Sequence, residues 1–263
     1  MTTKNIGIGT SNYGSRISPS NSIKLLKRSF DSGVNYIDTA PIYGFGNAEI
    51  IINMFIKKYK IKRESLIITT KFGLIPSKKI ILFRKYVLPF FRRIIFNIID
   101  KKSSVTTSVV FESKILKIAE IKKQIQRSLS NLDTDYIDNL VIHNNVFEYV
   151  KNKEIVNYLI SLKNKGVIKN IGISSGLITN EIIDLVNKND FINTLQLPLS
   201  NYEIHKQINR KIKYVFFSPF SNKKIDSYKI IDIIGKLNIE YTILVNFRTV
   251  SRLKINIDKI TKL

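Results

Sequence analysis

Four side chains that could exchange protons follow strand-like apolar runs in the first half of the chain. Asp38, Lys71 and His143 each end such a run, and Tyr43 lies in the loop just after the first of them. A phenol has an ordinary pKa of about 10, so Tyr43 is a proton donor at neutral pH. A neighbouring lysine ammonium would stabilise the phenolate that forms when the proton leaves. The set therefore suits proton transfer to a carbonyl oxygen while a hydride arrives at the carbon. In this arrangement Asp38 would hold Lys71 in place, and His143 would orient the substrate.

The elements that must position these residues alternate along the chain. Apolar runs that predict strands occupy residues 5–10, 34–38, 65–71, 136–143, 168–174, 192–197, 213–218 and 241–246. Stretches of helical periodicity follow them at 20–32, 47–59, 113–131, 151–165, 178–189, 203–211, 225–237 and 251–262. This alternation predicts an α/β fold, one closed (β/α)8 TIM barrel that forms a single domain over residues 1–263. The four side chains would then meet at the C-terminal mouth, where this fold builds its active sites.

An open doubly wound sheet is the alternative architecture. That fold normally carries a G-x-G-x-x-G phosphate turn after the first strand, whereas residues 7–14 read GIGTSNYG. The glycine spacing therefore favours the barrel. Ser20 and Thr179 are the predicted N-caps of their helices, and His205, on the predicted helix 203–211, is interpreted as a surface residue.

One connection is much longer than the others. Residues 72–112 separate the third predicted strand from its helix, and within them 78–100 mixes Arg and Lys with bulky apolar residues around Pro89. A long connection usually has a functional or packing role, so we expect an inserted loop that acts as a lid on the barrel rim. Contact of 78–100 with an anionic membrane surface is the alternative.

Composition excludes several classes of protein and site. The 263 residues include no cysteine, which excludes disulfides, thiolate metal sites and cysteine nucleophiles. Only His143 and His205 could offer imidazole ligands, so no metal site is expected. The N-terminus lacks the layout of a signal peptide and no long uncharged apolar run follows, so a cytoplasmic protein is expected. The net charge of +23 is spread through every segment, so no nucleic-acid partner is expected.

The chain resembles the aldo-keto reductases, which are NAD(P)H-dependent oxidoreductases built on a (β/α)8 barrel, and among them the compact bacterial-type members. The segments that carry the resemblance are GVNYIDTAPIYGFGNAE (33–49), IITTKFG (67–73), IQRSLSNLDTDYIDNLVIH (125–143), LKNKGVIKNIGISS (162–175), LQLPLSNYE (195–203), VFFSP (215–219) and RTVSRLKIN (248–256). The resemblance implies a catalytic tetrad, which Asp38, Tyr43, Lys71 and His143 match without substitution. In the family the tyrosine is the general acid.

The resemblance also implies a nicotinamide-cofactor site. The positions that correspond to it are Ser174, Ser175, Gln196, Phe217, Ser218, Arg248, Arg252 and Asn256. Ser175 stands where the family usually has Asn, and Phe217 stands where a Tyr normally stacks on the nicotinamide, a contact that the phenylalanine ring preserves. Asn246 and Phe247 replace the small or basic residues common after the last strand. The two arginines favour NADPH, because a guanidinium matches a phosphate, and NADH is the alternative.

The resulting hypothesis is a carbonyl reductase that converts an aldehyde or ketone, sugar-like by analogy with the family, to an alcohol. Tyr43 is its expected acid, and the protein is expected to be a monomer or a weak oligomer. A second hypothesis is an NADPH-binding sensor or accessory protein that keeps the barrel but turns over little. The departures at Ser175 and Phe217 motivate this second hypothesis, and the intact set of four side chains argues against it.

Overall fold

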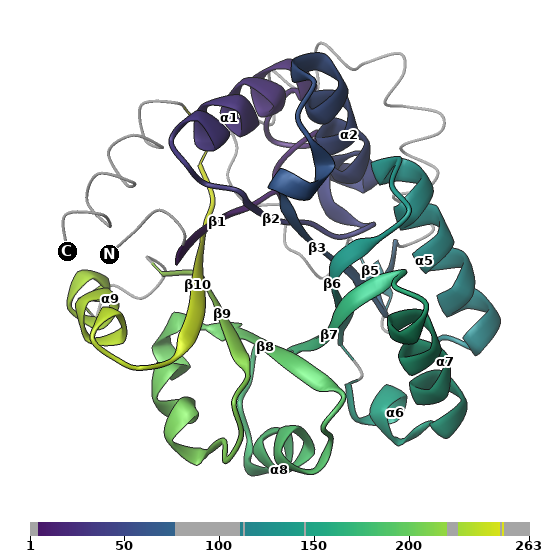
Figure 1. Ribbon diagram of the computed structural model, residues 1–263, viewed down its shortest axis with the longest axis vertical. Coiled ribbons are helices and arrows are strands. Elements are labelled where there is room, and N and C mark those ends of the chain that lie inside the picture. The colour runs from purple at the N-terminus through teal and green to yellow at the C-terminus, as the bar shows by residue number, and fades with distance from the viewer. Residues whose placement is uncertain are drawn as a thin grey trace.

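A closed parallel barrel forms the centre of the molecule. The computed structural model describes residues 5–76, 111–112, 114–144, 146–219, 226–247 and 249. Within these residues eight strands close in the order β1-β10-β9-β8-β7-β6-β3-β2, and helices surround them (Figure 1). The strands are β1 (Ile6–Gly9), β2 (Tyr36–Asp38), β3 (Ile67–Phe72), β6 (Ile137–His143), β7 (Ile168–Ser174), β8 (Ile192–Pro198), β9 (Lys213–Phe217) and β10 (Glu240–Val245). The predicted TIM barrel is confirmed, and every predicted strand is present.

The helices that cover the barrel follow most of the predicted periodic segments. They are α1 (Pro19–Asp31), α2 (Ala48–Tyr59), α5 (Ile118–Leu132), α6 (Val146–Lys151), α7 (Lys153–Asn164), α8 (Asn180–Lys188) and α9 (Ser227–Gly235). Short 3-10 helices lie at η2 (Tyr43–Gly46), η3 (Arg63–Ser65) and η6 (Leu199–Gln207). The helix predicted at 251–262 lies outside the described residues, and α6 was not predicted.

Two helix predictions were wrong in detail. The segment predicted as a helix at 203–211 is instead the 3-10 helix η6, which is kinked at Asn201, and the chain is extended again at Ile208. The N-cap of α1 is Ser18 and not Ser20, because Pro19 takes the first helical position and the Ser18 hydroxyl accepts from the Asn21 amide. Thr179 does precede α8 as predicted. His205 lies in η6, half-buried, with its Nδ1 2.9 Å from the Tyr202 carbonyl oxygen.

The long connection begins and ends as a paired stem. The backbone of β4 (Ile75–Pro76) pairs antiparallel with that of β5 (Phe111–Glu112). Residues 77–110 lie outside the described residues, so the predicted lid and the predicted membrane contact of 78–100 stay predictions. The extent of the single domain, 1–263, also stays a prediction.

Two hydrophobic layers hold the fold together. Buried side chains on the outer faces of the strands pack under the helices and form the main core, for example Ile68, Ile142 and Phe216. Inside the barrel a smaller cluster combines Tyr36 and Val215 with Leu244. Strands that are buried on both faces have continuous apolar sequences, which explains why all eight could be predicted from the sequence.

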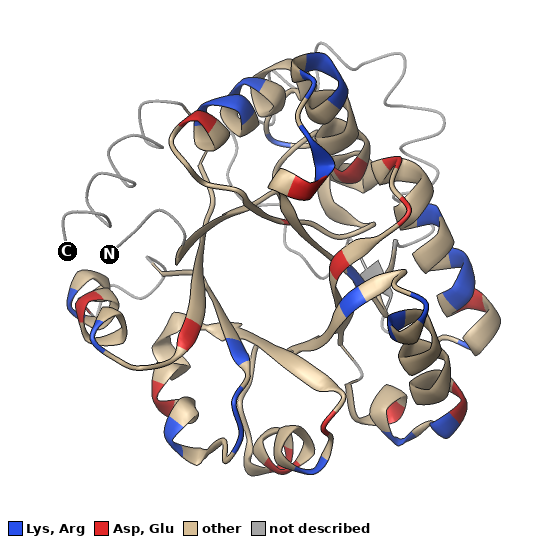
Figure 2. Cartoon of the chain, in the orientation of Figure 1, with Lys and Arg blue, Asp and Glu red and all other residues tan. Residues whose placement is uncertain are grey.

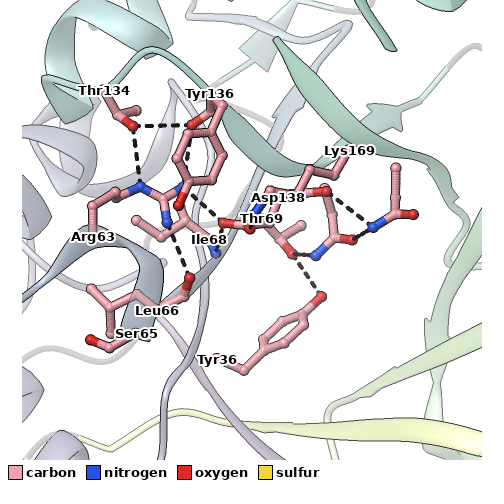
Figure 3. A network of polar contacts seen from close by, with 12 residues as sticks. Tyr36, Arg63, Ser65, Leu66, Ile68, Thr69, Thr134, Tyr136, Asp138 and Lys169 are labelled. Carbon is pink, nitrogen blue, oxygen red and sulfur yellow. Dashed lines mark hydrogen bonds and ion pairs between the residues drawn. The ribbon is translucent and has the colours of Figure 1, made fainter. Parts of the chain in front are cut away.

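A polar network lies near the N-terminal ends of three neighbouring strands of the barrel (Figure 3). Asp138, near the start of β6, is 5% exposed and accepts from Arg63 Nη2 at 2.8 Å, from Lys169 Nζ at 2.8 Å and from the Ile68 amide at 3.0 Å. The Tyr136 ring lies between both cations, 4.3 Å from the Arg63 guanidinium carbon and 4.1 Å from Lys169 Nζ. This network joins η3 with the first residues of β3, β6 and β7, so it ties neighbouring strands together.

Basic residues are distributed over the outer ring of helices and are interspersed with acidic ones (Figure 2). Several pairs neutralise each other on the surface, such as Lys27 with Asp31 and Lys57 with Asp133. Within the part of the chain that the structure describes, no helix is both long enough and apolar enough to cross a bilayer. The predicted cytoplasmic location and the predicted lack of a nucleic-acid partner stay predictions.

Candidate active site

The four predicted proton-transfer residues come together at the C-terminal mouth of the barrel. Asp38 is the last residue of β2, His143 is the last residue of β6, and Lys71 is the last but one of β3. Tyr43 begins η2, and its ring lies edge-on to that of His143, with 6.4 Å between the ring centroids and 87° between the planes. The Lys71 ammonium lies 4.8 Å from the centre of the Tyr43 ring. The phenol and the ammonium are therefore neighbours.

Lys71 is held by two hydrogen bonds and lies beside Tyr43. Its Nζ donates to Asp38 Oδ2 at 2.6 Å and to the Thr39 carbonyl oxygen at 2.9 Å. An ammonium has three donors and no acceptor, so one donor remains, and in any contact with the Tyr43 oxygen Lys71 would be the donor. The hydroxyl proton of Tyr43 is then available to a substrate oxygen.

Burial and charge set the protonation states of these groups. Burial raises the pKa of Tyr43 above that of an ordinary phenol, and the Lys71 ammonium opposes part of that rise. Burial, the largest single influence, would lower the pKa of Lys71, but the favourable interactions with Asp38 and Tyr43 together outweigh it and leave that pKa raised. Burial, aided by the charge of Lys71, lowers the pKa of His143 to about 3. At neutral pH the group therefore holds a protonated phenol, a charged ammonium and a neutral imidazole.

Burial also acts on Asp38, the carboxylate that holds Lys71. It raises the pKa of Asp38, while the Lys71 ammonium and the Gln196 amide oppose the rise. Gln196 Nε2 donates to Asp38 Oδ1 at 2.9 Å, so each carboxylate oxygen has its own donor. The ion pair is therefore fixed in position by hydrogen bonds at both ends of the carboxylate.

The loop that carries Tyr43 is held by close backbone contact with the loop after β1. Gly44 has a φ of 60°, which is in the left-handed region that favours glycine. A Cβ atom on Gly44 would come within 1.7 Å of the Tyr13 carbonyl oxygen. Asn47 Nδ2 donates to the Gly44 carbonyl oxygen at 3.1 Å and secures the other side of the turn. Glycine after Tyr43 is therefore a steric requirement.

A cavity of about 370 Å³ opens beside the four residues. Its lining comprises Gly9, Ser11, Asp38, Tyr43, Lys71, His143, Ser174, Gln196, Phe217, Ser218, Pro219, Leu244, Val245 and Asn246. The sheet register sets three of these side chains in one row, because His143 pairs with Ser174 and Ser174 pairs with Gln196. The cavity therefore brings the catalytic candidates together with part of the predicted cofactor set.

Gln196 carries an unused acceptor at this cavity. Its side chain is buried and its Nε2 is committed to Asp38, while its Oε1 has no hydrogen-bond partner within the described part of the chain. A buried polar atom without a partner is uncommon in folded proteins. An amide N–H of a bound molecule, such as the carboxamide of a nicotinamide, would satisfy it. The aromatic ring of Phe217 and the Ser174 hydroxyl line the same cavity, so the residues present fit such a group.

The remaining predicted cofactor residues differ in their placement. Ser218 lines the cavity with a φ of 53°. Ser175 does not line it, and its hydroxyl donates instead to the carbonyl oxygen of Leu177 in the same loop. The predicted contacts of Arg248, Arg252 and Asn256 lie outside the described residues.

Two polar residues of the cavity were not among the predicted site residues, although Asn246 was noted as a departure from the family after the last strand. Ser11 and Asn246 both line the cavity, and Asn246 Nδ2 donates to Ser11 Oγ at 2.8 Å, which joins the ends of β1 and β10. Each lies at the C-terminal end of a predicted strand, and that position could have identified them. Phe247, by contrast, is 2% exposed and belongs to the hydrophobic core.

Comparison with protein families agrees with this geometry. The model of the aldo/keto reductase family matches residues 5–240, which include the first seven strands of the barrel and reach the first residue of β10. The chain belongs to the aldo/keto reductase family. The resemblance inferred from sequence motifs is thereby confirmed.

Individual relatives are similar over part or all of the chain. It is 32% identical over 142 residues to a protein of Escherichia coli named NADH-specific methylglyoxal reductase, a match that covers 53% of this chain and 36% of that protein. It is 29% identical over 202 residues to aldo-keto reductase YhdN of Bacillus subtilis, over 75% of this chain and 50% of that protein. The chain thus matches half or less of the length of these two curated relatives.

Solved structures of aldo-keto reductases share the fold. A holo form from Bacillus halodurans superposes with a TM-score of 0.70 at 16% identity, over 97% of this chain and 86% of that one. A complex with NADPH from Klebsiella pneumoniae superposes with a TM-score of 0.63 at 15% identity, over 98% of this chain and 85% of that one. At such low identity these structures support the barrel architecture alone.

Proposed function

We propose that this aldo/keto reductase is an NAD(P)H-dependent oxidoreductase that reduces an aldehyde or ketone to an alcohol. The observation that carries the proposal is the close approach of the Lys71 ammonium to the Tyr43 phenol, 4.8 Å from the centre of its ring, at the wall of a cavity. A nicotinamide cofactor, when bound, supplies the hydride that adds to the carbonyl carbon. The protein must then supply a proton to the oxygen, and Tyr43 is the neutral acid placed to give it.

The other residues act on this proton transfer in distinct ways. The charge of the neighbouring Lys71 ammonium stabilises the phenolate that remains after the proton has left. Asp38 fixes Lys71 and balances its charge. His143, neutral at the pH of the cell, can hydrogen-bond the substrate oxygen without adding charge. Gln196 Oε1 would accept from the carboxamide of the cofactor and Phe217 would offer a stacking face.

The names of relatives leave both candidate cofactors open. The Escherichia coli relative is named NADH-specific, and the Klebsiella pneumoniae structure holds NADPH. The preference for NADPH rests on Arg248 and Arg252 and remains a prediction. The sugar-like substrate is also a prediction, and methylglyoxal, the substrate named for the Escherichia coli relative, is an equally direct first substrate to try.

The experiment mixes the purified protein with NADPH or NADH and a panel of methylglyoxal, small aldoses and simple ketones, and follows the absorbance of the reduced nicotinamide. We expect carbonyl-dependent oxidation of at least one of the two cofactors. Binding of the cofactor without reduction of any carbonyl compound would instead support the sensor hypothesis and contradict the proposal. Absence of cofactor binding would contradict both.

A further inference from the structure

The backbone that leaves the barrel after Lys71 needs hydrogen-bond partners outside the sheet. The ladder between β3 and β6 ends at the pair Phe72 and Ile142. Gly73 is buried and Leu74 is half-buried, and both lie beyond that last pair. Buried backbone N–H and C=O groups are almost always paired, so another part of the molecule must complete this turn.

One side chain, Gln124 of α5, completes it. Its Oε1 accepts from the Gly73 amide at 3.2 Å, and its Nε2 donates to the Leu74 carbonyl oxygen at 2.9 Å. A single carboxamide thereby bonds one backbone group in each of two consecutive residues, as a neighbouring strand would do within the sheet. Because α5 packs on the outside of β3, Gln124 ties the turn to the helix layer.

The same turn lies directly against a second catalytic candidate. Gly73 has a φ of 110°, and a Cβ atom there would lie 2.8 Å from the His143 carbonyl oxygen and 3.1 Å from Tyr149 Cε2. The Phe72 and Tyr149 rings are in contact, with 5.6 Å between their centroids. A shift of this turn would therefore be transmitted to Lys71 through two peptide units and to His143 through backbone contact.

We propose that Gln124 is a positioning residue for the carbonyl reduction proposed above, and that it acts by holding the Gly73–Leu74 turn so that Lys71 and His143 keep their places at the cavity. Gln124 does not line the cavity. Its effect on the reaction is indirect, through the turn. The expected change in kcat rests on the proposed function.

The kinetic test compares Gln124→Ala with Gln126→Ala, a matched control two residues along α5 where the side chain is exposed. We expect Gln124→Ala to lower kcat by about tenfold, since small misplacements of catalytic groups are costly, while the Kd of the cofactor changes by less than about twofold. Gln126→Ala should behave as the wild type. Gln124→Glu keeps the acceptor for Gly73 but loses the donor for Leu74, so its kcat should lie between that of the wild type and that of Gln124→Ala.

A second readout does not depend on turnover. In a His205→Gln background His143 is the sole histidine, so its imidazole signals can be followed by NMR during a pH titration. The side chains of Lys71 and Tyr43 face this ring. Loosening of the turn by Gln124→Ala should expose His143 and move its pKa from about 3 towards the ordinary value of 6.5, and Gln126→Ala should leave it in place.

The two readouts separate failure of the inference from failure of the proposed function. If the wild-type protein reduces no carbonyl compound, the proposed function fails and the NMR titration alone decides the role of Gln124. Gln124→Ala with wild-type kcat and wild-type imidazole signals would overturn the inference, even if it melted at a lower temperature. Should Gln124→Ala not fold, Gln124→Glu replaces it in both measurements under the same criteria.

Discussion

Two buried carboxylates, one at each end of the barrel, have opposite surroundings. Asp138 at the N-terminal end is 5% exposed and is bonded by Arg63, Lys169 and a backbone amide (Figure 3). Asp38 at the C-terminal mouth is 3% exposed, is bonded by Lys71 and Gln196, and lies on the wall of a cavity. Both are ion-paired, but only Asp38 borders space that a ligand could occupy.

The partners of the two carboxylates differ in the same way. At the N-terminal end both cations lie against the Tyr136 ring, 4.3 Å and 4.1 Å from its centre, and both bond to the same carboxylate. At the mouth the Lys71 ammonium lies 4.8 Å from the centre of the Tyr43 ring, and Gln196 keeps a buried acceptor that nothing in the described chain satisfies. Ion pairs thus tie neighbouring strands together at one end of the barrel and hold candidate catalytic groups at the other, in line with the division between a stabilising and a catalytic face in this fold.

The largest effect is expected from Lys71→Met, which leaves Asp38 buried without its cation. We expect reduction to fall at least about 10³-fold because the phenolate loses its stabilising charge. The free energy of unfolding should fall by about 3 kcal/mol, since breaking a buried ion pair strands a charge. Adding Asp38→Asn should recover most of the stability and none of the activity, as measured by urea unfolding and by the carbonyl assay. Recovery of activity in the double variant would contradict the catalytic role given to the ion pair at the mouth.

Asp138→Asn tests the other end of the barrel. It removes the carboxylate shared by Arg63 and Lys169, so we expect a loss of about 2 kcal/mol in unfolding free energy. The kcat of the folded protein should stay within about twofold of the wild type, because no catalytic candidate touches this network. Asp135→Asn, at an exposed position three residues earlier, is the matched control and should change neither quantity. A large loss of kcat at unchanged stability would show that the two ends are coupled.

The pH dependence of reduction sharpens the assignment at the mouth. The pKa of Tyr43 is raised by burial, so the protonated acid persists to higher pH than an ordinary phenol and reduction should fall only on the alkaline side, above about pH 10. His143, with a pKa of about 3, stays neutral and should add no acid limb between pH 5 and 8. The measurement is kcat for reduction against pH at saturating cofactor. A limb centred near pH 6.5 would contradict the neutral imidazole.

The smallest effect is expected from Phe217→Tyr, which restores the hydroxyl common in the family. Because the ring lines the cavity with or without the hydroxyl, stacking on the nicotinamide should be preserved. We expect the Kd of NADPH to change by less than about threefold, measured by fluorescence titration. A tenfold change in this Kd would show that the hydroxyl itself affects cofactor binding, and would contradict the proposal that the ring alone is enough.

The barrel could be predicted because its determinants are local and repetitive. Each strand is buried on both faces and reads as an apolar run, and Asp38, Lys71 and His143 end such runs at the same edge of a parallel sheet. The helix predicted at 203–211 failed because apolar spacing alone does not distinguish a regular helix from a kinked 3-10 helix. The cap at Ser18 was missed because the prediction gave no weight to Pro19 as the first helical residue.

The sequence could predict only those site residues whose chemical type and position at the end of a strand identify them. The partners of Asp38 could be placed because they lie on strands, whereas the role of Gln124 depends on which face of α5 meets a loop. The steric need for Gly44 likewise depends on Tyr13, which lies on another loop. Such contacts between loops and helices arise from tertiary packing, which single-sequence patterns do not encode.

The central claim, that Tyr43 protonates the carbonyl oxygen at the C-terminal mouth, is tested most directly by the kcat of Tyr43→Phe at saturating cofactor. We expect a fall of about 10³-fold, because the general acid is lost while the ring stays in place. The Kd for the cofactor and the unfolding free energy should both be unchanged. A Tyr43→Phe variant that turns over at the wild-type rate would contradict the claim.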